Sequence, residues 1–220
     1  LHNLDADPDL ELRIEFETVE SAGRSYRTLR VLPKNYREHQ KYPVIVEVYG
    51  GPTKVQVAHS RRNWLMSQWL ANQGFIVVAA DNRGTPGRGR AWETAVYGRF
   101  GDVPISDQIE ALKTLAKNHP EMDLERVGIW GWSFGGTLSA QGVLKYPEVF
   151  RAAVAGAPVT DWLDYDTHYT ERYLGTPQKH PQAYAESSLL PLAHQLQRPL
   201  LLVHGSADDN VYYRPSLRLS

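Results

Sequence analysis

The sequence predicts an α/β fold in which a mostly parallel sheet carries helices on both faces. Short apolar runs alternate with segments whose apolar residues recur at helical spacing, which is typical of a parallel sheet covered on both sides. Two segments of alternating polarity precede these runs and indicate a mixed sheet with an N-terminal hairpin. The 220 residues are enough for one domain with a substantial core.

The N-terminal hairpin is predicted from two alternating segments. Apolar and polar residues alternate over 11–19 and again over 26–32, and a Ser-Ala-Gly turn at 21–23 lies between them. This pattern is typical of an antiparallel pair at a sheet edge. Residues 1–10 are polar, and we expect them to form a linker that leads into the domain.

The core strands are predicted from five nearly continuous apolar runs, because strands buried on both faces carry few polar residues. These runs occupy residues 44–49, 75–80, 127–132, 152–157 and 199–204. Helical spacing predicts helices over 64–72, 105–118 and 137–145. Ser106 or Asp107 is the expected N-terminal cap of the second helix.

Two longer segments are predicted to lie outside this alternation. A Gly- and Arg-rich loop is expected after the second apolar run, up to about residue 101. Residues 159–198 are polar and aromatic and exceed what a simple crossover needs. We expect this insertion above the carboxyl ends of the strands, where ligands bind in open α/β sheets.

The composition excludes several classes of function. The formal net charge of −1 gives no reason to expect nucleic acid or an anionic membrane as a partner. The chain has no cysteine, which rules out disulfides, thiol catalysis and cysteine-ligated zinc. We expect no cofactor and no metal.

The most informative motif is Gly-x-Ser-x-Gly at residues 131–135, centred on Ser133. It follows an apolar run and precedes a predicted helix, which is the context of a nucleophile elbow. Such a turn pushes the serine hydroxyl clear of the sheet, and it needs glycines because side chains would collide with the neighbouring strand and helix. The motif predicts an α/β-hydrolase fold with Ser133 as the nucleophile.

A catalytic serine also needs a carboxylate and a histidine, which follow it along the chain of an α/β-hydrolase in that order. Asp208 meets the requirement for the acid, because it comes in the turn after the last apolar run. Asp209 is its immediate rival.

The histidine is the difficulty, since all eight histidines precede Asp208. A triad of Ser133, His204 and either Asp161 or Asp164 is an alternative, but it departs from the usual order. The simpler expectation places the base beyond residue 220, together with the C-terminal part of the fold. The 220-residue chain is then expected to be nearly inactive alone.

An oxyanion hole needs two hydrogen-bond donors aimed at the developing negative charge. One predicted donor is the backbone N–H of Phe134, the residue after the nucleophile. The second comes from the loop after the first core strand, where Tyr49-Gly50-Gly51-Pro52 offers the Tyr49 hydroxyl.

Five motifs together resemble the dipeptidyl peptidase IV branch of the prolyl oligopeptidase family of serine peptidases. The resemblance covers nearly the whole chain, and the motifs occur in the family's order. They are Tyr49-Gly50-Gly51-Pro52, Gly131-Trp132-Ser133-Phe134-Gly135-Gly136, Ala157-Pro158-Val159-Thr160-Asp161-Trp162, Tyr169-Thr170-Glu171-Arg172-Tyr173-Leu174-Gly175 and His204-Gly205-Ser206-Ala207-Asp208-Asp209-Asn210-Val211.

The resemblance also implies a substrate pocket. Its walls match Val159, Trp162, Tyr165, Tyr169 and Val211, and Asn210 matches a residue that binds the substrate carbonyl before the proline. The spacings of three and four among Trp162, Tyr165 and Tyr169 would place them on one face of a helix. Phe134 stands where many relatives have tyrosine, which removes a hydroxyl from one wall.

The implied activity is cleavage of peptides after proline or alanine, with release of N-terminal dipeptides. The resemblance also implies an absent β-propeller before residue 1, with residues 1–10 as its linker and 11–220 as an incomplete catalytic domain. It implies a homodimer in the full-length protein, and it favours a periplasmic or secreted location over a cytoplasmic one. Arg83 matches a family loop and is interpreted as structural.

Two other functions remain open at this point. The first is another α/β-hydrolase, such as an esterase or an acylaminoacyl peptidase. The aromatic residues of 159–175 argue against it, because they shape a small flat pocket. The second is a non-catalytic interaction module built on the same fold, against which the intact Gly-x-Ser-x-Gly motif and the well-placed Asp208 argue.

Overall fold

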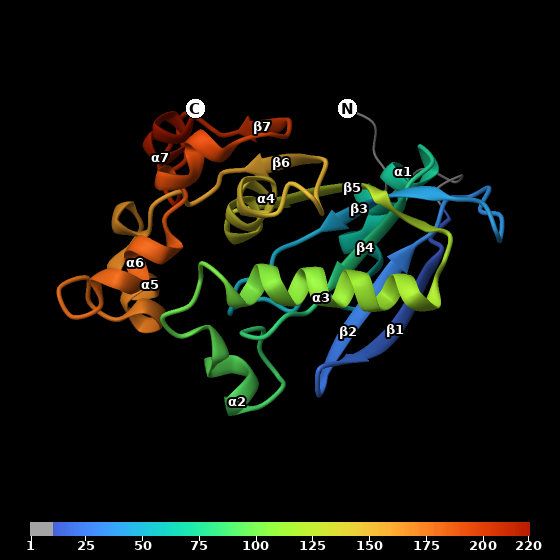
Figure 1. Ribbon diagram of the computed structural model, residues 1–220, viewed down its shortest axis with the longest axis horizontal. Coiled ribbons are helices and arrows are strands. Elements are labelled where there is room, and N and C mark those ends of the chain that lie inside the picture. Colours follow the sequence, from blue (N-terminus) through green and yellow to red (C-terminus); the bar gives the residue numbers. More distant parts are fainter. Residues whose placement is uncertain (1–10) are drawn as a thin grey trace.

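The centre of the fold is a seven-stranded mixed sheet in the order β1-β2-β4-β3-β5-β6-β7, in a computed structural model that describes residues 11–220 (Figure 1). The linker predicted at residues 1–10 lies outside the described residues. The strands are β1 (Ile14–Ser21), β2 (Arg24–Val31), β3 (Tyr42–Glu47), β4 (Ile76–Ala80), β5 (Met122–Trp132), β6 (Ala152–Gly156) and β7 (Leu200–Val203). Strands β3 to β7 pair in parallel, so the five predicted core strands and the mostly parallel sheet are confirmed.

The predicted hairpin is also present and lies at the sheet edge. Strands β1 and β2 pair antiparallel along their full length, and β2 pairs antiparallel with β4. The turn between them places Ala22 and Gly23 at φ values of 50° and 72°. Glycine accepts this left-handed conformation without a steric cost, which explains Gly23, whereas Ala22 adopts it against the steric preference of its Cβ.

Helices cover both faces of the sheet (Figure 1). The α-helices are α1 (Leu65–Asn72), α2 (Arg90–Glu93), α3 (Val103–Asn118), α4 (Phe134–Lys145), α5 (Thr167–Leu174), α6 (Pro181–Ser187) and α7 (Arg214–Leu219). The 3₁₀ helices are η2 (Arg61–Trp64), η3 (Thr94–Val96), η4 (Trp162–Asp164) and η5 (Leu190–Gln195). Within residues 11–220 no helix combines the length and the apolar character that crossing a bilayer requires.

The pleat of the central strands divides the core into two layers. Val44 and Val46 of β3 face α3 and α4, whereas Ile45 points to the opposite face and packs near Trp64 and Leu70 beside α1. All five residues of β4 are buried, which accounts for its uninterrupted apolar sequence.

The predicted cap of α3 is wrong. The helix begins at Val103, and the Asp102 carboxylate caps it by accepting a hydrogen bond from the Val103 amide at 2.8 Å. Pro104 stands in the first turn, where the absence of its N–H costs nothing. Asp107, one of the two predicted caps, instead lies inside the helix and pairs with Arg83 at 2.7 Å.

One face of the sheet is only partly covered within residues 11–220. Next to α1, a groove of about 340 Å³ lies over β3, β5 and β6. Its lining is apolar and consists of Ile45, Met66, Leu70, Gly128, Ile129, Trp130, Ala152, Ala153 and Val154. Leu201 and Val203 of β7 are exposed as well. We expect such exposed apolar surface to favour self-association of the isolated chain.

Candidate active site

Ser133 lies on a sharp turn between a strand and a helix. Strand β5 ends at Trp132 and α4 begins at Phe134, so Ser133 alone makes the turn. Its backbone has φ 59° and ψ −121°, a conformation that a residue with a side chain adopts only under strain. The Ser133 N–H donates to the Gly156 carbonyl at 2.8 Å, and its own carbonyl accepts from the Thr137 N–H at 3.0 Å. The local geometry is therefore that of the predicted elbow.

The motif glycines are required by close approach of the backbone. A Cβ added at Gly131 would lie 2.2 Å from the Val48 carbonyl oxygen, and one at Gly135 would lie 2.0 Å from the same atom. A Cβ at Gly136 would lie 2.3 Å from the Gly156 carbonyl oxygen. Heavy atoms cannot approach this closely, so each glycine lets α4 sit directly against the ends of β3 and β6.

We expect Gly131→Ala to lower the free energy of unfolding by about 2–3 kcal/mol, because the added methyl must displace backbone. Gly128→Ala is the matched control on the same strand, since its Cβ would lie 3.8 Å from the nearest atom. That variant should be neutral or slightly stabilising. Urea unfolding of both variants measures the difference, and equal stabilities would contradict the role of close packing at Gly131.

A cavity of about 190 Å³ opens beside Ser133. Its lining residues are Tyr49, Thr53, Ser133, Phe134, Val159, Trp162, Tyr165, Tyr169 and Asn210. Eight of the ten predicted site residues therefore meet in one place, although they come from four separate parts of the chain. The other two, Asp208 and Val211, are not part of the lining. Thr53 lines the cavity without having been predicted.

Three aromatic side chains form one wall of this cavity. The rings of Trp162 and Tyr169 lie nearly parallel, with centroids 6.2 Å apart and planes inclined by 19°. Tyr165 stands edge-on to both, at 5.8 Å from Trp162 and 5.7 Å from Tyr169. Such offset and edge-to-face arrangements are the favoured ones for aromatic rings.

The expectation that these three residues share one helix face is wrong. Trp162 belongs to η4, Tyr165 is extended, and Tyr169 belongs to α5. Asp161 caps the start of η4 by accepting from the Leu163 amide at 3.2 Å. Asp166 separates Tyr165 from Tyr169, because it caps a new helix, α5, by accepting from the Tyr169 amide at 2.8 Å. Aspartate is a favoured N-cap, so one short helix starts after Asp161 and a second starts after Asp166.

Phe100 supports the aromatic wall from behind and was not predicted. Its ring centroid lies 4.9 Å from that of Phe134, nearly perpendicular, and 4.8 Å from that of Trp162. It is 2% exposed. Phe100 ends a segment interpreted as a loop, and a single aromatic residue there carries no periodic signal that could have revealed this contact.

The cavity is neutral. Burial raises the pKa of Tyr169 and of Tyr165, so both phenols keep their protons at neutral pH. Within residues 11–220, the Tyr169 hydroxyl and the Trp162 indole N–H are buried without a hydrogen-bond partner. No group of three or more His, Asp or Glu side chains in that range could hold a metal ion.

Asp208 follows β7 in a turn that fixes its carboxylate. One oxygen, Oδ1, accepts hydrogen bonds from the amides of Asn210 and Val211, both at 3.0 Å. The side chain is partly buried, whereas neighbouring Asp209 is exposed. The geometry favours Asp208 over its rival, because only its carboxylate has a fixed orientation.

His204 is engaged in the structure of the turn and not with Ser133. Its Nε2–H donates to the Val211 carbonyl and its Nδ1 accepts from the Ser216 hydroxyl, both at 2.7 Å. Asp161 caps η4 and Asp164 pairs with Arg218. The alternative triad therefore lacks the contacts it needs. Among residues 11–220, no histidine forms a hydrogen bond with Ser133.

The sheet order, the elbow at Ser133 and the Asp208 carboxylate after β7 are those of an α/β-hydrolase domain. Within that class, the family model described as "Prolyl oligopeptidase family" matches residues 62–220. This is more than half of the chain, which therefore belongs to the prolyl oligopeptidase family, as its motifs predicted.

Relatives and solved structures agree with this assignment. Dipeptidyl peptidase 8 of human and of mouse are each 41% identical over 187 residues, a match that covers 82% of this chain and 21% of theirs. The crystal structure of Porphyromonas gingivalis dipeptidyl peptidase 4 superposes with a TM-score of 0.87 and 36% identity, covering 94% of this chain and 29% of that one. The chain thus spans about a fifth of the length of these curated relatives.

Proposed function

We propose that this chain carries the nucleophile, the acid and the oxyanion hole of a serine peptidase that cleaves after proline or alanine. The observation that carries the proposal is the single cavity that Ser133 shares with Tyr49 and with the aromatic wall. Residues that bind a substrate ring and residues that act on the next carbonyl must be neighbours, and here they line one space.

In this proposal Ser133 attacks the carbonyl carbon of the scissile peptide bond. The negative charge that develops on the carbonyl oxygen is stabilised by the Phe134 amide and the Tyr49 hydroxyl. Asp208 orients the histidine that takes the serine proton. We place this histidine outside residues 11–220, because none in that range contacts Ser133. The 220 residues alone are then inactive.

The preference for proline follows from the shape and neutrality of the cavity. A proline ring is compact, apolar and rigid, and flat aromatic faces hold it through buried area without a charge. A cavity of about 190 Å³ suits a small ring and gives a charged side chain no partner. Asn210 completes this part of the proposal: its Oδ1 accepts from the Tyr165 hydroxyl at 3.2 Å, which aims the amide group at the cavity rim. Its N–H₂ is then the donor for the substrate carbonyl before the proline.

Release of dipeptides, the β-propeller, and homodimer formation are further parts of the proposal. They are supported by family membership and by relatives that are named dipeptidyl peptidases. In this scheme residues 1–10 link the propeller to the catalytic domain of residues 11–220, and the propeller binds the free amino terminus of the peptide.

The test uses the complete gene product and chromogenic amides of Gly-Pro, Gly-Ala and Gly-Arg, each with a free and a blocked amino terminus. We expect kcat/KM for Gly-Pro to exceed that for Gly-Arg by about 100-fold or more, since the pocket lacks a counter-charge. Gly-Ala should lie between them. Preference for Gly-Arg would contradict the proline pocket. Equal cleavage of the blocked substrate would favour an acylaminoacyl peptidase.

A further inference from the structure

We propose that Asn82 is a positioning residue of the oxyanion hole, which holds the Tyr49 loop by a hydrogen bond to the Gly50 carbonyl. The inference rests on the proposed function, in which the Tyr49 hydroxyl stabilises the oxyanion. Asn82 lies in the loop after β4 and touches neither Ser133 nor the cavity. It therefore acts through Tyr49 and not on the substrate.

The side chain of Asn82 binds two backbone carbonyls and one side chain. It is fully buried, and its Nδ2 donates to the Gly50 carbonyl at 2.9 Å and to the Arg83 carbonyl at 2.6 Å. Its Oδ1 accepts from Gln108 Nε2 on α3 at 2.9 Å. Both N–H groups and the oxygen are therefore used, which leaves the amide one orientation.

The Tyr49 loop is consequently held on both sides of Tyr49. Before it, the Val48 N–H donates to the Trp130 carbonyl at 2.9 Å, which ties the loop to the strand that carries Ser133. After it, Asn82 holds Gly50, whose φ of 72° and tight surroundings allow no side chain. A Cβ at Gly50 would lie 2.4 Å from Leu138 and 2.9 Å from the Asn82 oxygen.

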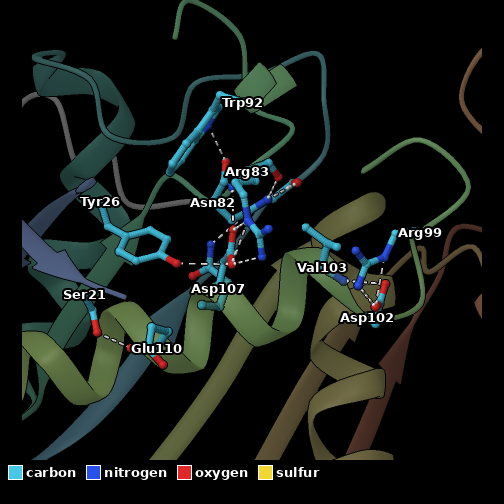
Figure 2. Close-up of polar contacts among 12 residues, drawn as sticks. Ser21, Tyr26, Asn82, Arg83, Trp92, Arg99, Asp102, Val103, Asp107 and Glu110 are labelled. Atoms are coloured by element: carbon cyan, nitrogen blue, oxygen red, sulfur yellow. Dashed lines mark hydrogen bonds and ion pairs between the residues drawn. The ribbon is translucent and has the colours of Figure 1, made fainter. Parts of the chain in front are cut away.

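The turn that carries Asn82 is anchored by an ion pair between its neighbour Arg83 and Asp107 of α3, as Figure 2 shows. The Asp107 carboxylate accepts from the Arg83 amide at 2.8 Å and from the Arg83 guanidinium at 2.7 Å, and it also accepts from the Tyr26 hydroxyl at 3.2 Å. Hydrogen bonding with Asp107 raises the pKa of Arg83, so the guanidinium stays charged. The turn around Asn82 thus has a fixed position relative to α3.

This arrangement affects catalysis more than binding. The Tyr49 hydroxyl lies at the far end of a long side chain, so a small rotation of the Gly50 peptide displaces it strongly. An oxyanion donor acts mainly in the transition state, and its misplacement lowers kcat while KM changes little.

The test variants are Asn82→Asp and Asn82→Ser in the complete gene product. The aspartate keeps the acceptor for Gln108 but turns an oxygen toward two carbonyl oxygens, and the serine is the neutral alternative should the aspartate prevent folding. We expect kcat on the Gly-Pro amide to fall about 10- to 100-fold. KM should stay within about threefold, and affinity for a peptide boronate, which mimics the tetrahedral adduct, should fall in parallel with kcat.

Thr85→Val is the matched control in the same turn. It removes the bond from the Thr85 hydroxyl to the Asn82 carbonyl, at 2.8 Å, and leaves the Gly50 bond intact. Its kcat should stay within about threefold of the parent value. A loss equal to that of the Asn82 variants would overturn the inference, because any disturbance of the turn would then suffice.

A double-mutant cycle with Tyr49→Phe separates this inference from the proposed function. We expect the Asn82 substitution to change kcat by less than about threefold once the Tyr49 hydroxyl is gone. Additive losses would show that Asn82 does not act through Tyr49, while the role of Tyr49 itself would stand. A Tyr49→Phe variant with unchanged kcat would refute the oxyanion role and the inference with it.

Discussion

Ser133→Ala is expected to lower kcat/KM on a Gly-Pro amide by about a millionfold, since no covalent adduct can form without the hydroxyl. The substitution removes one oxygen and keeps the Cβ, so the strained backbone at residue 133 is unchanged. Thermal unfolding should therefore match that of the parent protein. The measurement is steady-state turnover of the complete gene product, and labelling by an active-site fluorophosphonate should disappear with it.

The matched control is Ser139→Ala on the same helix. Ser139 is buried and its hydroxyl donates to the Gly135 carbonyl at 2.8 Å. It lies six residues after Ser133. Its loss should leave turnover within a few-fold of the parent. Residues 1–220 alone should give only the Ser133→Ala background. Substantial turnover by Ser133→Ala would mean that another residue is the nucleophile.

Asp208→Asn is expected to lower kcat by about 10⁴-fold, the effect of neutralising the acid of a serine triad. Asparagine is isosteric and its oxygen can keep the bonds from the Asn210 and Val211 amides, so the turn should retain its shape. Asp209→Asn, one residue further on, should have little effect because that side chain is exposed. Turnover and thermal unfolding of both variants separate catalysis from folding.

A reversed result would reassign the acid. If Asp209→Asn lost activity while Asp208→Asn kept it, the turn after β7 would have to present its carboxylates differently from the structure. Loss in both variants, with lowered unfolding temperatures, would indicate that the turn has a structural role and that neither carboxylate is individually the triad acid.

Much of the fold could be predicted because each core strand is a short, nearly continuous apolar run. Strand β4 is apolar throughout, which is the pattern expected of a strand that is buried on both faces. The elbow was predictable because any side chain at Gly131 or Gly135 would clash with Val48. The two required glycines lie close to Ser133 in the sequence and form a recognisable motif. Helix α3 shows the limit, since periodicity located its body but not its first residue, where the Asp102 cap decides.

The features that were missed depend on contacts between distant segments. Asn82 and Gly50 are 32 residues apart, and nothing in either local sequence refers to the other. Phe100 likewise contacts Phe134 and Trp162, which lie far from it in the sequence. Trp162, Tyr165 and Tyr169 line one cavity, but the helix expected from their spacing of three and four does not form, because Asp166 caps a new helix between Tyr165 and Tyr169.

The strained backbone at Ser133 has a consequence for how this domain evolves. A φ of 59° with ψ of −121° suits glycine better than any residue with a side chain, so a serine at 133 opposes the preference of the fold. Selection for turnover and selection for stability oppose one another at this position. In a descendant that no longer needs the reaction, glycine at 133 would both silence the site and relieve the strain. Copies of the domain that have lost the reaction are therefore expected to acquire glycine at position 133. The residue at this position would then indicate whether a lineage still uses the reaction.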